Sequence, residues 1–256
     1  MSATHEAGLG LGLLSIGRTW GYRSEPPPSE ADARRLLEVA FESGIQCFDT
    51  APAYGTSEER FGVFLATLGA LREGLLVATK LGEHWDAQTQ ASFTDHSHDA
   101  LRRSLDQSLR RLGRIDLLQV HKATAANVGA PGVVRTLEYA RSLGIRWLGA
   151  SISDVAAAEA ACAVGLYSHL QFPYNTLNRT LEPVFALASR HGLQVLINRP
   201  FAMGQVLHDT DRPRETVLRE ALDHVLRQPF RGWVLTGTKS TDHLRQTLAA
   251  FRSRGG

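Results

Sequence analysis

Short apolar runs alternate with longer amphipathic segments along the whole chain. The apolar runs have the length of buried strands and fall at residues 8–17, 46–50, 75–80, 117–121, 147–152, 169–174, 195–199 and 233–236. A segment with helical periodicity follows each run, at residues 29–43, 57–68, 99–112, 132–143, 155–164, 181–190, 215–228 and 242–251. Strands that alternate with helices of this length form parallel βαβ units.

Eight such units with no linker between them favour a closed barrel over an open sheet. The sequence therefore predicts one α/β domain over residues 1–256, a single (β/α)8 TIM barrel of parallel strands. In that fold cofactor and substrate bind at the C-terminal face of the strands. At the start of the helix over residues 57–68, Thr56 and Glu59 fit a capping box.

Composition agrees with this fold class and narrows the range of partners. The chain has 256 residues, close to the typical length of such a barrel, with 43% apolar and 21% charged residues. The net charge of +2 is too small to indicate a nucleic-acid partner. A basic cluster between Arg102 and Arg114 lies mainly on the predicted helix over residues 99–112, and its spacing is typical of a solvated outer face.

Cysteine usage and hydropathy indicate a cytoplasmic protein. The two cysteines, Cys47 and Cys162, are too few for a disulfide framework, so we expect reduced thiols. No apolar run approaches the roughly 18 residues of a membrane span, so no membrane partner is expected. The apolar residues 9–14 lack a basic leader and a cleavage site, which favours a first strand over a signal peptide. The oligomeric state is left open.

Four polar residues stand at or just after the ends of predicted strands. Asp49 ends the second apolar run, Tyr54 follows it at a turn, Lys80 ends the third run, and His121 ends the fourth. In a parallel barrel these ends meet at one mouth, where catalytic groups collect. Alone, each residue has an ordinary structural role, such as a loop cap or a solvated lysine. Together, in this order, they favour a catalytic site.

This constellation and its surroundings resemble the aldo-keto reductase superfamily. The order and approximate spacing agree from about residue 8 to residue 250. The matching text is Asp49-Thr50-Ala51-x-x-Tyr54-Gly55, Thr79-Lys80, Asp116-Leu117-Leu118-x-x-His121, Gln171-x-Pro173-Tyr174-Asn175 and Gly237-Thr238-Lys239-Ser240. The resemblance implies an NADPH-dependent oxidoreductase that reduces an aldehyde or a ketone to an alcohol.

The resemblance also implies a role for each of the four residues. Tyr54 would be the general acid, although a free tyrosine has a pKa near 10, too high for good acid catalysis at neutral pH. Lys80 would lower that pKa through its charge, and Asp49 would hold Lys80 by a salt bridge. His121 would orient the substrate carbonyl.

The cofactor site implied by the resemblance is on the barrel itself, and no Gly-x-Gly-x-x-Gly turn indicates a Rossmann fold. Lys239 beside Ser240, at the start of the last helix, favours the 2′-phosphate of NADP(H). Nothing in the sequence requires a metal. The residues that match cofactor-binding positions are Arg18, Thr19, Asp49, Ser151, Gln171, Thr238, Lys239, Ser240 and His243.

Two positions depart from the family pattern. Ile152 stands where the family usually has an asparagine, and Asn198 occupies the position of an aromatic residue that stacks on the nicotinamide. Arg199 or Phe201 would have to compensate for the lost aromatic ring. For the substrate, aromatic loop residues at the expected mouth predict an apolar pocket lined by Trp20, Trp85 and Phe201.

Two alternatives stay open at this stage. The chain could be a non-catalytic NADP-binding regulatory or interaction module on the same fold. It could also be a Schiff-base lyase that uses Lys80 as a nucleophile, in which case nicotinamide would be irrelevant.

Overall fold

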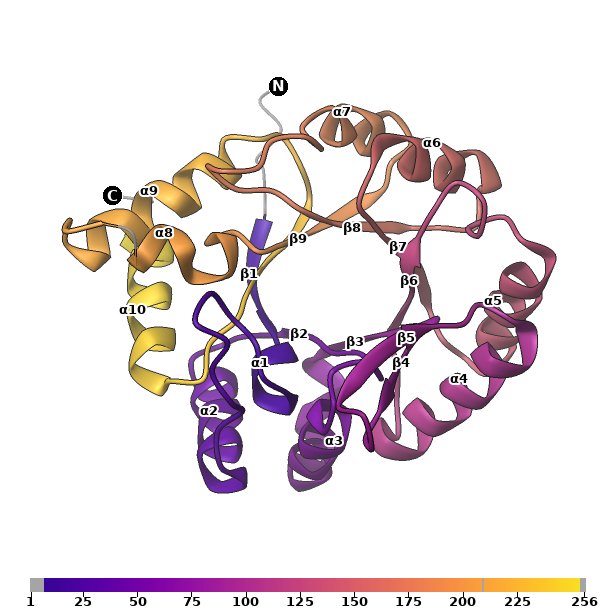
Figure 1. Cartoon of the computed structure of the whole chain (residues 1–256), viewed down its shortest axis with the longest axis horizontal. Coiled ribbons are helices and arrows are strands. Elements are labelled where there is room, and N and C mark those ends of the chain that lie inside the picture. The colour runs from indigo at the N-terminus through magenta and orange to yellow at the C-terminus, as the bar shows by residue number, and fades with distance from the viewer. Residues whose placement is uncertain (1–6, 209, 254–256) are drawn as a thin grey trace.

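Eight parallel strands close into a barrel in the computed structural model, which describes residues 7–208 and 210–253 (Figure 1). The order around the barrel is β1-β10-β9-β8-β7-β6-β3-β2. The predicted α/β barrel of parallel strands is therefore confirmed. The strands are β1 (Ala7–Gly12), β2 (Cys47–Asp49), β3 (Leu76–Leu81), β6 (Leu117–Ala123), β7 (Trp147–Ile152), β8 (His169–Pro173), β9 (Gln194–Asn198) and β10 (Gly232–Thr236).

Helices surround this barrel as an outer ring, with a long helix between each strand and the next (Figure 1). They are α2 (Glu30–Glu42), α3 (Ser57–Thr67), α4 (His98–Leu112), α5 (Pro131–Ser142), α6 (Val155–Val164), α7 (Pro183–Arg190), α9 (Arg214–Leu226) and α10 (Thr241–Arg252). Shorter turns lie between them: α1 (Leu14–Gly17), α8 (Gln205–His208), η1 (Gly69–Gly74) and η2 (Ala202–Gly204). No helix among the described residues is long and apolar enough to cross a membrane.

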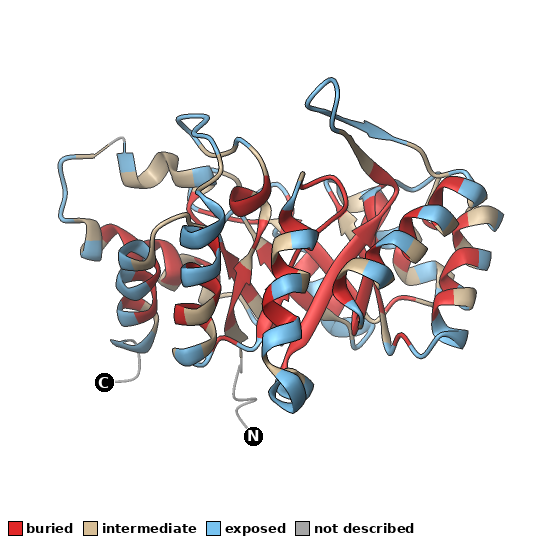
Figure 2. Ribbon diagram, turned by 90° about the horizontal axis from the view of Figure 1, so that it is seen from below, coloured by how far each residue is buried: buried red, intermediate tan, exposed pale blue. Residues whose placement is uncertain are grey.

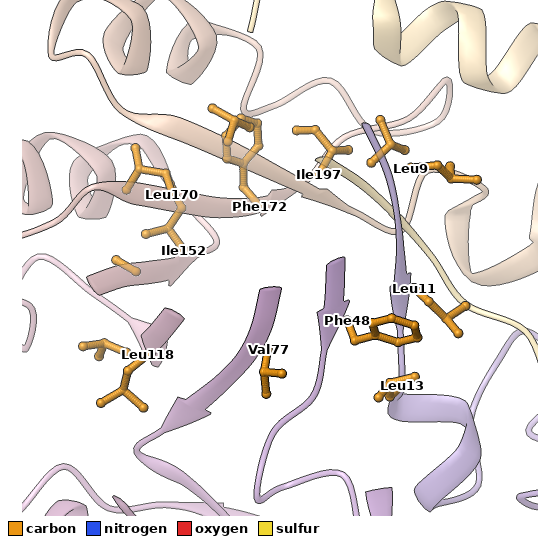
Figure 3. Close-up of a cluster of buried hydrophobic side chains, with 14 of the residues drawn as sticks. Leu9, Leu11, Leu13, Phe48, Val77, Leu118, Ile152, Leu170, Phe172 and Ile197 are labelled. Carbon is orange, nitrogen blue, oxygen red and sulfur yellow. The ribbon is translucent and has the colours of Figure 1, made fainter. Parts of the chain in front are cut away.

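Alternation along each strand divides its side chains between the barrel interior and the helices. On β2, Phe48 points outward and stacks on Phe61 of α3, with ring centroids 5.2 Å apart. Its neighbours Cys47 and Asp49 therefore face the interior. Figure 3 shows outward residues of several strands, including Leu11, Phe48 and Val77, in the buried cluster under the helices. The same parity turns the polar strand-end residues inward.

Two local predictions are wrong. The first strand ends at Gly12, and residues 14–17 form α1, whose buried Ile16 packs beside α3 and gives the sequence a strand-like apolar run. Thr56 does precede α3, but its side chain makes no capping bond to the helix. Its hydroxyl donates to the carbonyl oxygen of Gly17 (3.3 Å), so it ties α3 to α1.

A hairpin that the sequence pattern does not predict follows β3. Strands β4 (Glu83–Asp86) and β5 (Ala91–Thr94) pair antiparallel, with Trp85 opposite Ser92. Its exposed tip, pale blue in Figure 2, projects away from the barrel. The base of the hairpin is buried at Glu83, so this insertion contributes to the barrel mouth.

Candidate active site

A cleft of about 590 Å³ lies at the C-terminal ends of the strands. Most of the predicted site residues line it: Arg18, Trp20, Asp49, Tyr54, His121, Ser151, Gln171, Phe201, Thr238, Lys239, Ser240 and His243. Lys80 lies beneath the cleft floor, in contact with Asp49 and Tyr54. Two other predicted residues are not in the lining: Thr19, which is exposed, and Trp85, whose ring instead contacts the lining residue Arg18.

Lys80 and Asp49 form an ion pair inside the barrel. Lys80 Nζ lies 2.5 Å from Asp49 Oδ2 and donates a second bond to the Thr50 carbonyl oxygen at 3.0 Å. Both side chains are almost fully buried. Burial lowers the pKa of Lys80, but its charge interactions and hydrogen bonds with Asp49 and Tyr54 together outweigh burial, and the pKa ends above its ordinary value. Lys80 is therefore a fixed cation at neutral pH.

The second oxygen of Asp49 is held by two amides. Gln119 Nε2 donates to Asp49 Oδ1 at 2.8 Å, and Gln171 Nε2 donates to the same oxygen at 3.0 Å. Gln171 is among the predicted site residues, whereas Gln119 is not. Gln119 precedes His121 by two residues on β6, so strand period alone places it on the inward face.

Tyr54 lies over this ion pair at the cleft floor. Lys80 Nζ is 4.8 Å from the centroid of the Tyr54 ring, and the tyrosine is 8% exposed. Burial raises the pKa of Tyr54 more than Lys80 lowers it, so the pKa ends above 10. The expected effect of Lys80 is present, but the prediction of a net lowering is wrong here because desolvation of the phenolate costs more. Tyr54 is a neutral phenol that holds its proton.

Two glycines fix the turn that carries Tyr54. Gly55 has φ +61°, and a Cβ there would lie 2.3 Å from the Gly17 carbonyl oxygen. A Cβ on Gly17 would lie 1.9 Å from the Tyr54 carbonyl oxygen. Any side chain at either position would push the two loops apart, so this interlock sets the position of Tyr54 against α1.

His121 faces Tyr54 across the cleft floor. The two ring centroids are 5.8 Å apart at an interplanar angle of 81°. Burial lowers the pKa of His121 to about 4, despite the opposing effect of Glu83, so the imidazole is neutral at pH 7. His121 Nδ1 lies 3.0 Å from Glu83 Oε2, without the alignment of a hydrogen bond.

Glu83 is a site residue that sequence reasoning missed. Burial raises its pKa, but His121, Lys122 and Ser92 outweigh burial and lower the pKa to about 2. Glu83 is thus a buried anion behind the histidine. No strand or helix pattern marks residues 83–94, because the hairpin is polar and mostly exposed.

Ser151, Gln171 and Asn198 lie together on inward positions of β7, β8 and β9. Gln171 Oε1 accepts from Ser151 Oγ at 3.3 Å and from Asn198 Nδ2 at 3.5 Å. Asn198 Oδ1 is buried with no hydrogen-bond partner. Ile152 is buried in the hydrophobic cluster under the helices, and Arg199 is exposed, with its guanidinium over Trp20.

The other end of the cleft lies at the start of α10. Ser240 caps this helix by accepting from the His243 backbone N–H at 3.3 Å. Lys239 Nζ donates to the carbonyl oxygens of Glu25 (2.5 Å) and Pro26 (2.8 Å). The lysine that the sequence predicts to bind a phosphate is therefore already bound to the loop after β1. Arg214, which the sequence pattern does not single out, lines the same end.

Comparison with known proteins identifies the family of this barrel. The model of the aldo/keto reductase family matches residues 8–220. A crystal structure assigned to the aldo-keto reductases of Pseudomonas aeruginosa superposes with a TM-score of 0.78 at 30% identity, covering 94% of this chain and 88% of that one. The holo form of an aldo-keto reductase from Bacillus halodurans gives 0.78 at 25% identity, covering 95% and 86%.

A curated relative extends the comparison to an enzyme with a named substrate. Pyridoxal 4-dehydrogenase of Microbacterium luteolum is 26% identical over 317 aligned positions, which span 95% of this chain and 89% of the relative. The family match covers most of the chain and includes the segments that carry Asp49, Tyr54, Lys80 and His121. The chain is therefore an oxidoreductase that belongs to the aldo/keto reductase family.

Proposed function

We propose that this protein reduces an aldehyde or a ketone to an alcohol with NADPH in the cytoplasm. The observation that carries the proposal is a protonated, buried Tyr54 directly above the Lys80–Asp49 ion pair. A phenol at the floor of a cleft can give its proton to a carbonyl oxygen. The cation beneath it then stabilises the phenolate that the proton leaves behind.

The remaining polar residues would hold these two groups in position. Asp49 keeps Lys80 charged, and Gln119 and Gln171 keep Asp49 oriented. His121 Nδ1 faces Glu83 without a hydrogen bond, so the neutral ring can carry its single proton on Nε2 and donate it to the substrate oxygen. This would align the carbonyl carbon for reaction while Tyr54 faces its oxygen.

A nicotinamide cofactor, when bound, supplies the hydride for such a reaction. The residues of the cleft fit it, because the buried Oδ1 of Asn198 has no partner and can accept from an amide group. Ser151 and Gln171 lie beside it. The N-terminus of α10, with Lys239 and Arg214 nearby, suits phosphate groups and favours NADPH over NADH.

The two alternative functions receive less support. A Schiff-base lysine must be neutral and must reach the substrate, whereas Lys80 is buried, charged and paired with Asp49. A non-catalytic NADP-binding module would not need a buried proton donor above a fixed cation. Neither alternative accounts for the convergence of Tyr54, Lys80, Asp49 and His121 on one cleft.

The test is a direct measurement of turnover. Purified protein is titrated with NADPH and with NADH by nucleotide fluorescence, and NADPH oxidation is then followed at saturating cofactor with a panel of aldehydes. Tight NADPH binding with aldehyde-dependent oxidation supports the proposal. Tight binding with no oxidation for any aldehyde points to the non-catalytic module. If neither nucleotide binds, the proposal is overturned.

A further inference from the structure

Arg18 is held next to the proposed proton donor by the backbone around it. Gly17 and Gly55 pack closely together, and this packing places Arg18 beside Gly55. A Cβ added to Gly55 would lie 3.3 Å from the Arg18 Cβ. Gly55 directly follows Tyr54, and the Thr56 backbone N–H donates to the Gly17 carbonyl oxygen at 3.1 Å. The side chain of Arg18 therefore starts beside Tyr54 and lines the same cleft.

Two indole rings hold the guanidinium of Arg18. Its central carbon lies 5.8 Å from the centroid of the Trp20 ring and 5.2 Å from that of the Trp85 ring. Trp20 comes from the loop after β1, and Trp85 comes from the β4–β5 hairpin. Contact through the faces of aromatic rings leaves the N–H groups at the edge of a guanidinium free for other partners.

Those N–H groups have no acceptor within the described part of the protein. Arg18 Nε is buried without a hydrogen-bond partner, and no carboxylate of the described chain lies within ion-pair distance of this side chain. A buried donor left unpaired costs free energy, more so when it belongs to a charged group. Such a group is normally completed from outside the chain, by water, an ion or a ligand.

The charges around Arg18 leave this part of the cleft positive. Three acids line the cleft, and each already has a cation: Asp49 has Lys80, Glu83 has Lys122 at 3.8 Å, and Glu25 has Lys239 at 3.9 Å.

Arg199 adds a second guanidinium over Trp20, at 5.5 Å, from a backbone with φ +53°. This left-handed conformation is costly for an arginine, so its surroundings must hold it there. No carboxylate among the described residues lies within ion-pair distance of Arg199 either. Two cations thus share one indole, and neither is paired with a carboxylate of the described residues.

From these contacts we infer that Arg18, with Trp20 and Trp85, forms an oxyanion subsite, and that the carbonyl substrate carries a carboxylate or a phosphate group. The inference rests on the proposed function and gives it a substrate class. An oxyanion matches the planar fork of Arg18 in two parallel bonds, while the indoles contact the apolar part of the substrate. The carbonyl group would then lie toward Tyr54 and His121.

The experiment compares aldehydes that differ mainly in charge. We expect kcat/KM to be higher for 4-carboxybenzaldehyde and for 4-formylphenyl phosphate than for 4-methylbenzaldehyde, with the better of the two anions identifying the preferred oxyanion. Arg18→Met should lower this anionic-to-neutral ratio by about 10-fold or more, as expected for loss of charge-assisted hydrogen bonds. Arg18→Lys, which keeps the charge but not the fork, should lie between them.

Two controls separate an anion subsite from a general effect of positive charge and from a role in cofactor binding. Arg110→Met, at an exposed position of α4, should leave the ratio unchanged. NADPH titration of each variant tests whether Arg18 instead serves the cofactor diphosphate. A ratio near one in the wild type overturns the inference, and so does weaker NADPH binding in Arg18→Met with an unchanged ratio.

Failure of the proposed function would look different. If no aldehyde is reduced, binding of 4-(hydroxymethyl)benzoate is followed by tryptophan fluorescence in the wild type and in Arg18→Met. Binding that is lost in the variant supports the anion subsite without turnover. Equal binding, or none in either protein, overturns the inference.

Discussion

The interior of the barrel and the rim of the cleft use polar residues in opposite ways. Inside, Asp49 accepts from Lys80, Gln119 and Gln171, each from a different strand, and all four side chains are buried. At the rim, Arg18 is held by aromatic faces, and Lys239 by backbone carbonyls of a loop. The interior groups therefore have one fixed arrangement. At the rim, Arg18 keeps N–H groups that a ligand can use, whereas Lys239 can bind a ligand only by releasing these carbonyl oxygens.

Among interior substitutions, Tyr54→Phe should cause the largest loss of activity. We expect kcat/KM for aldehyde reduction to fall by about 10²–10⁴-fold, the usual contribution of a positioned general acid, while NADPH still binds. Steady-state rates and nucleotide fluorescence measure the two effects. Tyr167→Phe is the matched control, because Tyr167 is equally buried but donates to the Val128 carbonyl oxygen at 2.7 Å, outside the cleft. Equal activity in the two variants would remove Tyr54 from the mechanism.

Loss of one member of the buried ion pair should have the largest effect on stability. Lys80→Met leaves the Asp49 charge buried without its cation, and we expect the free energy of unfolding to fall by about 3–5 kcal/mol. Urea unfolding at neutral pH measures this loss. The double variant Asp49→Asn with Lys80→Met should lose less than the single variant, since no lone charge stays buried.

An exposed ion pair provides the contrast. Arg212 donates two bonds to Glu220, at 2.8 and 2.6 Å, but both side chains are about half exposed. Arg212→Met should leave the unfolding midpoint nearly unchanged because solvent screens such pairs. If the two single variants lose equal stability, the distinction between interior and surface charges is wrong.

The difference between interior and rim also decides what the sequence could predict. Strand ends and period two place Asp49, Lys80, His121, Ser151 and Gln171 on inward positions, and β7 has the predicted bounds, Trp147–Ile152. Gln119 could have been found in the same way, two residues before His121. These strands are strongly apolar, so burial decides which side chains face inward and which face outward.

Many rim residues could be predicted, but the contacts between them could not be, because loop paths depend on contacts distant in sequence. Glu83 reaches His121 only because residues 83–94 fold as a hairpin, whose polar residues show no alternation. Arg18 meets Trp85 only because two glycines interlock two loops. The net pKa of Tyr54 could not be predicted either, since the sequence shows the neighbouring lysine but not the depth of burial.

Acid should lower the stability of the fold because two buried histidines are neutral in the folded state. Burial lowers the pKa of His121 and of His169 to about 4, from 6.5. The unfolded chain takes up protons below pH 6.5 that the folded chain does not bind until about pH 4, so stability falls as the pH drops through this window. Each histidine contributes up to about 3 kcal/mol to this loss. Urea unfolding at pH 7.5, 6, 5 and 4 measures it.

His169 allows the interior origin of this acid sensitivity to be isolated. Its side chain faces the barrel interior but is not part of the cleft lining. The centroid of its ring lies 6.0 Å from that of Trp147 and 6.5 Å from that of Trp233. His169→Gln should reduce the loss of stability between pH 6.5 and pH 4. His191→Gln, at an exposed position, should not. The same pH profile in both variants would place the acid sensitivity elsewhere in the chain.

Lys239 tests the rim, where the expected effect is smallest. Its ammonium donates to the Glu25 and Pro26 carbonyl oxygens, yet it lines the cleft beside Ser240. If it exchanges these carbonyls for a phosphate, Lys239→Met should weaken NADPH binding by about tenfold and NADH binding much less. Lys122→Met, at the opposite end of the cleft, should not change the ratio of the two affinities. Equally weakened binding of NADPH and NADH would instead mean that Lys239 only stabilises the loop after β1. Any preference for NADPH would then come from Arg214 or His243.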